Sequence, residues 1–269
     1  METNEAQRRR WNDEYFASLW PRQERVTDRV TGHLLDELAL RPGERVLDVG
    51  SGGGKATLAA ARAVAPGGEA VGADVSAPLS RLAAGRAVEA GVENVAFQVV
   101  DVQTDPVEGA PFDVAMSQFG VMFFDEPVTA FTNLRAQLGE DARLAFVCWQ
   151  SAERNPWFPF EALAPFVPPF PEPAPGKSPT GPFALADPER TTAILEAAGF
   201  TGVVRTAHAL DADVAVDPMD DVELAYRGVR PDELAAARAS LDAHAEQFRL
   251  PSGLFRFPLR FQLFRAVAA

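Results

Sequence analysis

The sequence predicts an α/β fold in which seven strands alternate with helices. A short apolar strand at residues 45–49 runs into a glycine-rich turn, and a helix over residues 56–64 follows directly. Further apolar runs, most of them separated by helical segments, predict the other strands, at residues 69–73, 95–100, 112–118, 143–150, 201–210 and 254–267. A chain that alternates strands and helices in this way forms a largely parallel sheet with helices on its faces.

The glycine-rich turn is typical of a nucleotide-binding corner, because glycine lets the backbone approach a ligand closely. Its spacing excludes a Walker loop, since Lys55 is followed by alanine rather than serine or threonine. The dinucleotide fingerprint G-x-G-x-x-G does not fit either, because lysine or threonine stands where its third glycine is required. The pattern that fits is Asp-x-Gly-x-Gly-x-Gly, formed by Asp48, Gly50, Gly52 and Gly54.

Acidic residues follow the next two strands. Asp74-Val75-Ser76 ends the second strand, where a carboxylate can accept hydrogen bonds from both ribose hydroxyls of a nucleotide. Asp101-Val102 follows the third strand. Together with the glycine motif over residues 46–54, these segments resemble the cofactor motifs of class I S-adenosylmethionine (SAM)-dependent methyltransferases, in particular the ubiquinone/menaquinone methyltransferase-like branch.

The resemblance implies a Rossmann-like, seven-stranded, mostly parallel sheet whose last strand is antiparallel. It also implies SAM as the cofactor, S-adenosylhomocysteine as the product, and Asp101 and Val102 as the residues that contact the adenine. The residues expected to bind the cofactor are Asp48, Gly50, Ser51, Gly52, Gly54, Asp74, Val75, Ser76, Asp101, Val102, Ser117 and Gln118.

The end of the fourth strand should face this site, because ligands of open α/β sheets bind outside the carboxyl ends of the strands. Ser117 and Gln118 are therefore expected near the transferred methyl group, and Phe119 and Met122 in the wall of the pocket. Packing against the next helix is the alternative for the aromatic residues.

An N-terminal helical lid is expected over residues 1–40. A helix over residues 4–20 would carry Trp11, Tyr15 and Trp20 on an aromatic face, which suits both a sulfonium cation and an apolar acceptor. The alternative is a helix that only packs on the flank of the domain.

A general base is usually needed when the methyl acceptor is oxygen or carbon. A helix over residues 22–40 would place His33 one position from its apolar stripe, either as a packed histidine or as that base. We expect His208 to be structural and His244 to be exposed. The remaining candidates are Tyr15 and Tyr226.

A proline- and aromatic-rich segment interrupts the alternation at residues 151–186. Its prolines lower the entropy lost on ordering, and its aromatic content is not that of a disordered linker. We expect a cap over the substrate, to which Trp157 and Phe158 contribute; a dimer contact is the alternative. This segment would separate the SAM-binding core, residues 41–150, from the C-terminal part of the core, residues 187–269 with a helical insertion at 217–248.

The net charge of −13 would repel nucleic acids and anionic membranes, so neither is expected as a partner. Cys148 is the only cysteine, which excludes an intrachain disulfide. Neither a leader nor a long uncharged apolar run is evident, and we expect a cytoplasmic monomer or homodimer.

These observations predict an enzyme that transfers a methyl group from SAM to an oxygen or carbon atom, with nitrogen less favoured, of a small hydrophobic or aromatic metabolite. The catalytic candidates are His33 and Gln118, and no metal is expected. The alternative is a SAM-binding protein of the same fold that does not methylate, either a regulatory scaffold or a non-methylating SAM-dependent enzyme. The glycine spacing disfavours a nicotinamide-dependent oxidoreductase.

Overall fold

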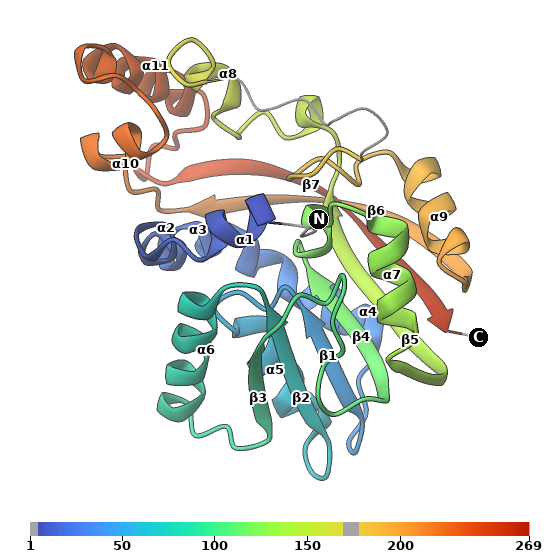
Figure 1. Ribbon diagram of the computed structural model, residues 1–269. Helices are drawn as coiled ribbons and strands as arrows, with labels where there is room; N and C mark the ends of the chain where they lie inside the picture. The colour runs from blue at the N-terminus through green and yellow to red at the C-terminus, as the bar shows by residue number, and fades with distance from the viewer. Residues whose placement is uncertain (1–4, 169–177, 269) are drawn as a thin grey trace.

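The computed structural model describes residues 5–168 and 178–268 and places seven strands in one twisted sheet (Figure 1). The strands are β1 (Arg45–Val49), β2 (Glu69–Asp74), β3 (Val95–Val99), β4 (Phe112–Gln118), β5 (Leu138–Trp149), β6 (Phe200–Val214) and β7 (Phe255–Ala268). Their order is β3-β2-β1-β4-β5-β7-β6. The first five strands run parallel to one another, and β7 is antiparallel to both β5 and β6. The predicted fold class is confirmed, including the antiparallel last strand.

Helices cover both faces of the sheet. In Figure 1, α4 (Thr31–Leu38) and α5 (Lys55–Val64) lie on the far face, and α7 (Pro127–Arg135) and α9 (Pro188–Ala197) lie on the near face. A further helix, α6 (Ala77–Glu89), packs on β2 and β3. Across the described part of the chain, no helix combines the length and the apolar character needed to cross a bilayer.

The predicted single helix over residues 4–20 is wrong, because the chain breaks there into α1 (Glu5–Trp11), α2 (Glu14–Ser18) and the start of α3 (Trp20–Thr27). The side chain of Asn12 leaves the helix to hydrogen-bond the β2–α6 connection, and Asp13 starts a new helix by accepting the N–H of Phe16. Asparagine and aspartate compete for backbone groups in this way and therefore favour helix ends.

The predicted helix over residues 22–40 is also divided. Its first part begins at Trp20, with Pro21 in the first turn. N–H groups in the first turn of a helix have no partner within the helix, so proline is tolerated there. A 3₁₀ turn, Asp28–Val30, separates it from α4, and the left-handed Ala39 (φ 45°) ends the second part. The interruption turns α3 away from the flank of the sheet and over its carboxyl end (Figure 1).

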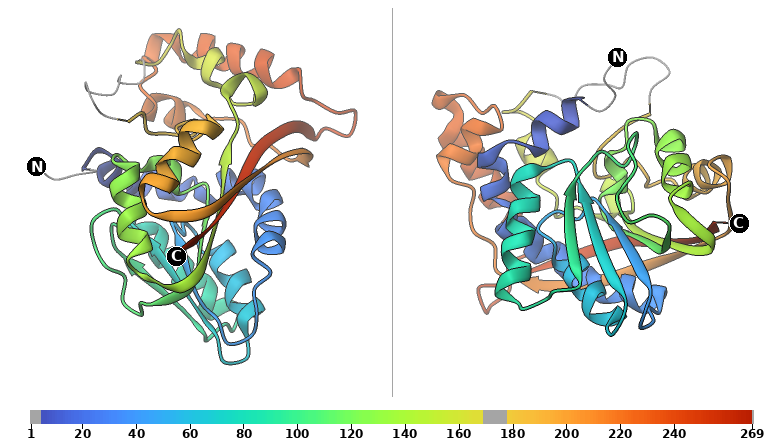
Figure 2. Two further views of the ribbon diagram at one scale, coloured as in Figure 1. Left: turned by 90° about the vertical axis from the view of Figure 1, so that its right-hand side faces the viewer. Right: turned by 60° about the horizontal axis from the view of Figure 1, so that its bottom comes forward.

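The segment between β6 and β7 forms the predicted helical insertion beyond the end of the sheet. It contains α10 (Asp221–Tyr226), a 3₁₀ turn (Pro231–Glu233) and α11 (Leu234–Glu246), and α11 packs on α8 (Phe160–Leu163) from the cap. Figure 2 shows that these helices stand apart from those on the faces of the sheet. The insertion connects the ends of β6 and β7. These two ends pair with each other beyond the last residue of β7 that pairs with β5. Pro258 lies in that region, where it interrupts no bond to β5.

The core of the sheet is aromatic. Phe146 of β5 stacks on Phe264 of β7 with ring centroids 5.3 Å apart, and Phe131 of α7 lies 5.5 Å from Phe146. All three rings are fully buried. This packing joins α7 to the β5–β7 part of the sheet. Two further 3₁₀ turns complete the described elements, Val121–Phe123 after β4 and Ala152–Arg154 after β5.

Candidate functional site

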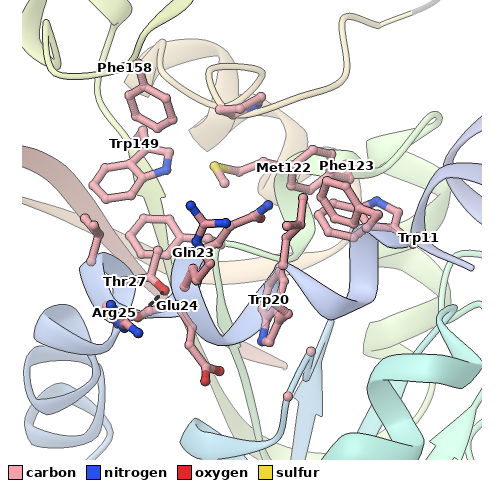
Figure 3. A pocket seen from close by; sticks show the side chains of 18 of the residues that line it. Trp11, Trp20, Gln23, Glu24, Arg25, Thr27, Met122, Phe123, Trp149 and Phe158 are labelled. Atoms are coloured by element: carbon pink, nitrogen blue, oxygen red, sulfur yellow. Dashed lines mark hydrogen bonds between the residues drawn. The ribbon is translucent and has the colours of Figure 1, made fainter. Parts of the chain in front are cut away.

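A cavity of about 870 Å³ opens at the carboxyl ends of β1, β2, β4 and β5, beneath the N-terminal helices (Figure 3). The predicted cofactor motifs line one end of it. The other end is lined by residues of α8 and α11 and by the extended part of β7. Open α/β sheets bind their ligands at this edge, and the volume is in the range of small-molecule sites.

The glycine turn forms the floor of the first end. Gly50, Gly52 and Gly54 all have positive φ (70°, 52° and 80°), a conformation that L side chains rarely adopt. The indole of Trp20 lies directly on this floor, so that a Cβ added to Gly52 would come within 2.6 Å of the ring. Glycine is therefore required at position 52 both by the backbone conformation and by the close approach of Trp20.

Asp74 joins the ends of β1 and β2. Its buried carboxylate accepts the N–H of Gly52 and the N–H of Ser76, each at 2.8 Å. Burial raises the pKa of Asp74, and the backbone N–H groups that it accepts oppose that rise. Each carboxylate oxygen retains lone pairs for a further donor, such as a ribose hydroxyl.

Asp48 lies behind the glycine turn and is almost completely buried. Thr57 Oγ1 donates to its Oδ2 at 2.6 Å, whereas its Oδ1 has no partner within the described residues. Burial raises the pKa of Asp48 to about 7; the bond from Thr57 opposes this effect, and the nearby Asp74 adds to it.

Asp101 and Val102 line the cavity after β3, as the sequence predicts. The Asp101 carboxylate accepts the N–H of Gln103 at 3.1 Å and Arg8 Nε of α1 at 3.2 Å. The first helix thus reaches the residue expected to contact adenine.

Two of the residues predicted to bind the cofactor do not line the cavity. Ser76 Oγ donates to the carbonyl of Trp11 and accepts the N–H of Leu79, so it caps α6 and holds the lid. Ser117 Oγ donates to the carbonyl of Val49 at 2.7 Å and fixes the turn after β4. The hydroxyls of Ser76 and Ser117 are both occupied by hydrogen bonds to backbone groups. These two residues therefore stabilise the loops that form the site. The ten other predicted residues line the cavity; they are Asp48, Gly50, Ser51, Gly52, Gly54, Asp74, Val75, Asp101, Val102 and Gln118.

The donors of SAM, which are its ribose hydroxyls, ammonium and adenine amine, fit the polar groups at this end. Gln118 donates through Nε2 to the carbonyl of Thr27 at 3.1 Å, while its buried Oε1 has no partner in the described chain. The same holds for Asp48 Oδ1 and Ser51 Oγ. Buried acceptors without partners cost free energy, which a ligand that donates hydrogen bonds would recover.

The aromatic face of the lid differs from the prediction. Trp11 lines the cavity as predicted, with its ring 5.0 Å from Phe123 and 6.0 Å from Trp20. Tyr15 is not in the wall; it packs on Tyr226 of α10 at 5.0 Å, because the break at residues 12–13 turns α2 away. Trp20, which the sequence predicts on the same aromatic face, does line the cavity, but from the start of α3 rather than from the end of one long helix (Figure 3).

The predicted acceptor-side residues Phe119, Met122, Trp157 and Phe158 all line the cavity. Phe119 stacks on Trp149 with centroids 4.1 Å apart, and Trp149 meets Trp157 and Phe158 edge-on. Residues of the cap thus contact the carboxyl end of β5. The prolines and Phe170 within residues 169–177 lie outside the described residues.

Of the three histidines, only His244 differs from the expectation drawn from the sequence; His33 and His208 pack against each other and Phe261. His33 faces His208 at 5.2 Å and Phe261 at 5.4 Å, outside the cavity, so it is not brought to the cofactor motifs. Its position on the flank of β6 and β7 is that of a packed histidine. His244, expected to be exposed, is half-buried and lines the far end of the cavity.

Replacement of Gly52 by alanine should be more damaging than the same change at Gly67. Both residues have positive φ, but a Cβ at Gly67 would meet only Gly43 Cα, at 3.9 Å. We expect Gly67→Ala to cost about 1–2 kcal/mol of stability and to leave SAM affinity unchanged. Gly52→Ala should cost more and weaken SAM binding at least about tenfold, since Trp20 must move. Urea denaturation and calorimetric titration check this, and equal effects at both sites would contradict it.

Asp48→Asn tests the raised pKa. Because the folded pKa of about 7 exceeds the ordinary value of 3.8, the stability contributed by protonated Asp48 is lost as the pH rises toward 7. The stability of the wild type relative to Asp48→Asn should therefore fall by about 2–3 kcal/mol between about pH 5 and about pH 8. Asp213→Asn is the control. Arg256 lowers the pKa of Asp213, so the difference in stability between the wild type and Asp213→Asn should stay constant over the same pH range. A flat difference for Asp48→Asn would contradict the assignment.

Comparison with known proteins agrees with this geometry. Residues 46–141 match the family model described as a methyltransferase domain. Aklanonic acid methyltransferase DauC of Streptomyces sp. (strain C5) is 30% identical, over 49% of this chain and 56% of that protein. The ubiquinone/menaquinone biosynthesis C-methyltransferase UbiE of Ectopseudomonas mendocina is 31% identical, over 40% of this chain and 46% of that protein. The chain thus spans about half the length of these relatives.

A solved SAM-dependent methyltransferase from Aquifex aeolicus has the same fold. It is 16% identical and superposes with a TM-score of 0.56, over 96% of this chain and 99% of that one. The domain match, the relatives and the fold confirm the resemblance seen in the sequence motifs. Residues 46–141 therefore match a methyltransferase domain, and the chain as a whole resembles the class I SAM-dependent methyltransferases in fold.

Proposed function

We propose that this chain transfers the methyl group of SAM to an oxygen or carbon atom of a small, largely apolar or aromatic metabolite. The observation that carries the proposal is the continuity of the cavity. One end is lined by the cofactor motifs around Gly52 and Asp74, and the aromatic side chains of Trp149, Trp157 and Phe158 line the same cavity. A cofactor and an acceptor can therefore meet in this one cavity.

The relatives support a small-molecule acceptor. DauC is named for aklanonic acid, and UbiE for C-methylation in ubiquinone and menaquinone biosynthesis. The similarity covers the cofactor-binding half of this chain, so the acceptor is inferred from the aromatic wall of its own cavity.

Bound SAM would supply an electrophilic methyl on a sulfonium centre, and the chain has to orient the two reactants. Asp74 and Asp101 are buried and line the cavity; under this proposal they would accept hydrogen bonds from the nucleoside and hold the cofactor along the strand ends. Gln118 Oε1 has no partner in the described residues and would accept a hydrogen bond from a ligand. Phe119 and Trp149 stack on each other and line the cavity, where their rings would supply aromatic surroundings that suit a sulfonium cation. Under this proposal, the N-terminal helices and the segment after β5, which contribute to the lining, would limit the access of water and so favour methyl transfer to the acceptor over hydrolysis.

Asp74→Ala tests the cofactor end. Removing this carboxylate frees the N–H of Gly52 and takes away the expected ribose contact, so SAM affinity should fall at least about tenfold. The matched control is Asp113→Ala, whose carboxylate accepts the N–H of Arg45 at the opposite end of the sheet. Calorimetric titration with SAM, and mass spectrometry of S-adenosylhomocysteine formed with a panel of phenols and quinols, are the measurements.

The wild type and Asp113→Ala should form S-adenosylhomocysteine and a methylated product with at least one acceptor, and Asp74→Ala should not. Tight SAM binding without methylation of any compound in the panel would favour the alternative of a non-methylating SAM-binding protein. Unchanged SAM affinity in Asp74→Ala would contradict the proposed cofactor site.

A further inference from the structure

Among the polar side chains that line the far end of the cavity, one has a buried nitrogen that the proposed methyl transfer does not use. His244 of α11 lines the cavity, and its Nε2 is shielded from solvent without a hydrogen-bond partner in the described residues. His208 has the same kind of unpartnered Nε2 but lies outside the cavity, stacked on Phe261 at 5.0 Å. Only the imidazole of His244 is therefore placed to meet a ligand in the cavity.

A continuous row of rings joins the cofactor end to this histidine. Trp149 of β5 lies 5.5 Å from Trp157 of the cap, and Trp157 stacks on Phe257 of β7 at 5.2 Å and 21°. Phe257 lies 5.6 Å from Phe248, which in turn lies 5.6 Å from His244. All five residues line the cavity. An aromatic surface several rings long thus ends at the imidazole of His244.

The cations near this end are already neutralised. Arg238 pairs with Asp221, and Arg249 pairs with Glu246 at 2.6 Å while lying over the ring of Phe255. A ligand group at this end therefore meets aromatic rings, the imidazole of His244 and the carboxylate of Asp242, and both arginines already have acidic partners. A neutral hydroxyl or carbonyl suits that setting better than a carboxylate or phosphate, which would be desolvated without a partner cation.

We propose that the cavity binds an extended, planar, multi-ring acceptor whose end remote from the transferred methyl carries a hydroxyl or carbonyl oxygen that hydrogen-bonds His244 Nε2. This inference rests on the proposed function and specifies its substrate class. Planar rings match the stacked and edge-on faces of the wall, and the hydrogen bond satisfies a buried nitrogen that otherwise has no partner. His244 acts as a specificity residue, because several rings separate it from the residues around the cofactor.

The probe is anthraflavic acid, a planar three-ring quinone with one hydroxyl at each end, compared with the analogue that lacks one of the two hydroxyls. Binding to the full chain is followed by quenching of tryptophan fluorescence, in the presence of S-adenosylhomocysteine. We expect the wild type to bind the dihydroxy compound about three- to tenfold more tightly than the analogue. His244→Leu should lose this preference, and His208→Leu, the matched control outside the cavity, should keep it.

His244→Gln, which restores a polar group, should regain part of the preference. An equal preference in the wild type and His244→Leu, loss of the preference in His208→Leu, or failure of both compounds to bind would overturn the inference. SAM binding is titrated on the same samples without the probe. Normal SAM binding together with any of these outcomes leaves the proposed methyl transfer intact, whereas loss of SAM binding in the wild type would overturn the proposed function itself.

Discussion

The contact between Asp74 and Gly52 is the constraint on which the site depends. The carboxylate at the end of β2 accepts a backbone N–H from the turn after β1, so two neighbouring strands end in one fixed arrangement. That bond requires the turn to adopt positive φ at Gly52, and the absence of a side chain there lets Trp20 lie on the turn. The sheet, the glycine turn and the lid therefore meet at a single residue, where any side chain would disturb all three.

The lid is held to this point by buried polar contacts rather than by apolar packing alone. Glu24 of α3 is buried and pairs with both Arg86 of α6 and Lys55 of α5. Arg86 also donates to the carbonyl of Gly53 at 2.8 Å, which connects the lid to the glycine turn through one guanidinium. Breaking a buried pair leaves an uncompensated charge, so these contacts specify one closed position for α3. The sequence around Lys55 does not fit a phosphate-binding loop. Its ion pair with Glu24 gives Lys55 a structural role instead.

Much of the fold and of the cofactor end could be predicted because their signals are local. Glycines and acids that directly follow strands are carried to the same sheet edge by the parallel topology, and Asp48, Asp74 and Asp101 were found in this way. Side chains whose direction depends on tertiary contacts could not be placed. Tyr15 was misplaced because Asp13 begins a new helix, α2, that turns Tyr15 away, and His244 was misplaced because α11 packs on α8, which lies far away in sequence.

The central claim is that the end of the cavity around Gly52 and Asp74 binds SAM. Calorimetric titration of the wild-type protein with SAM, S-adenosylhomocysteine and NADH tests it most directly. The account predicts one-to-one binding of the first two ligands with dissociation constants on the order of micromolar, and no binding of NADH. A folded protein that binds neither SAM nor S-adenosylhomocysteine, or that prefers NADH, would contradict it.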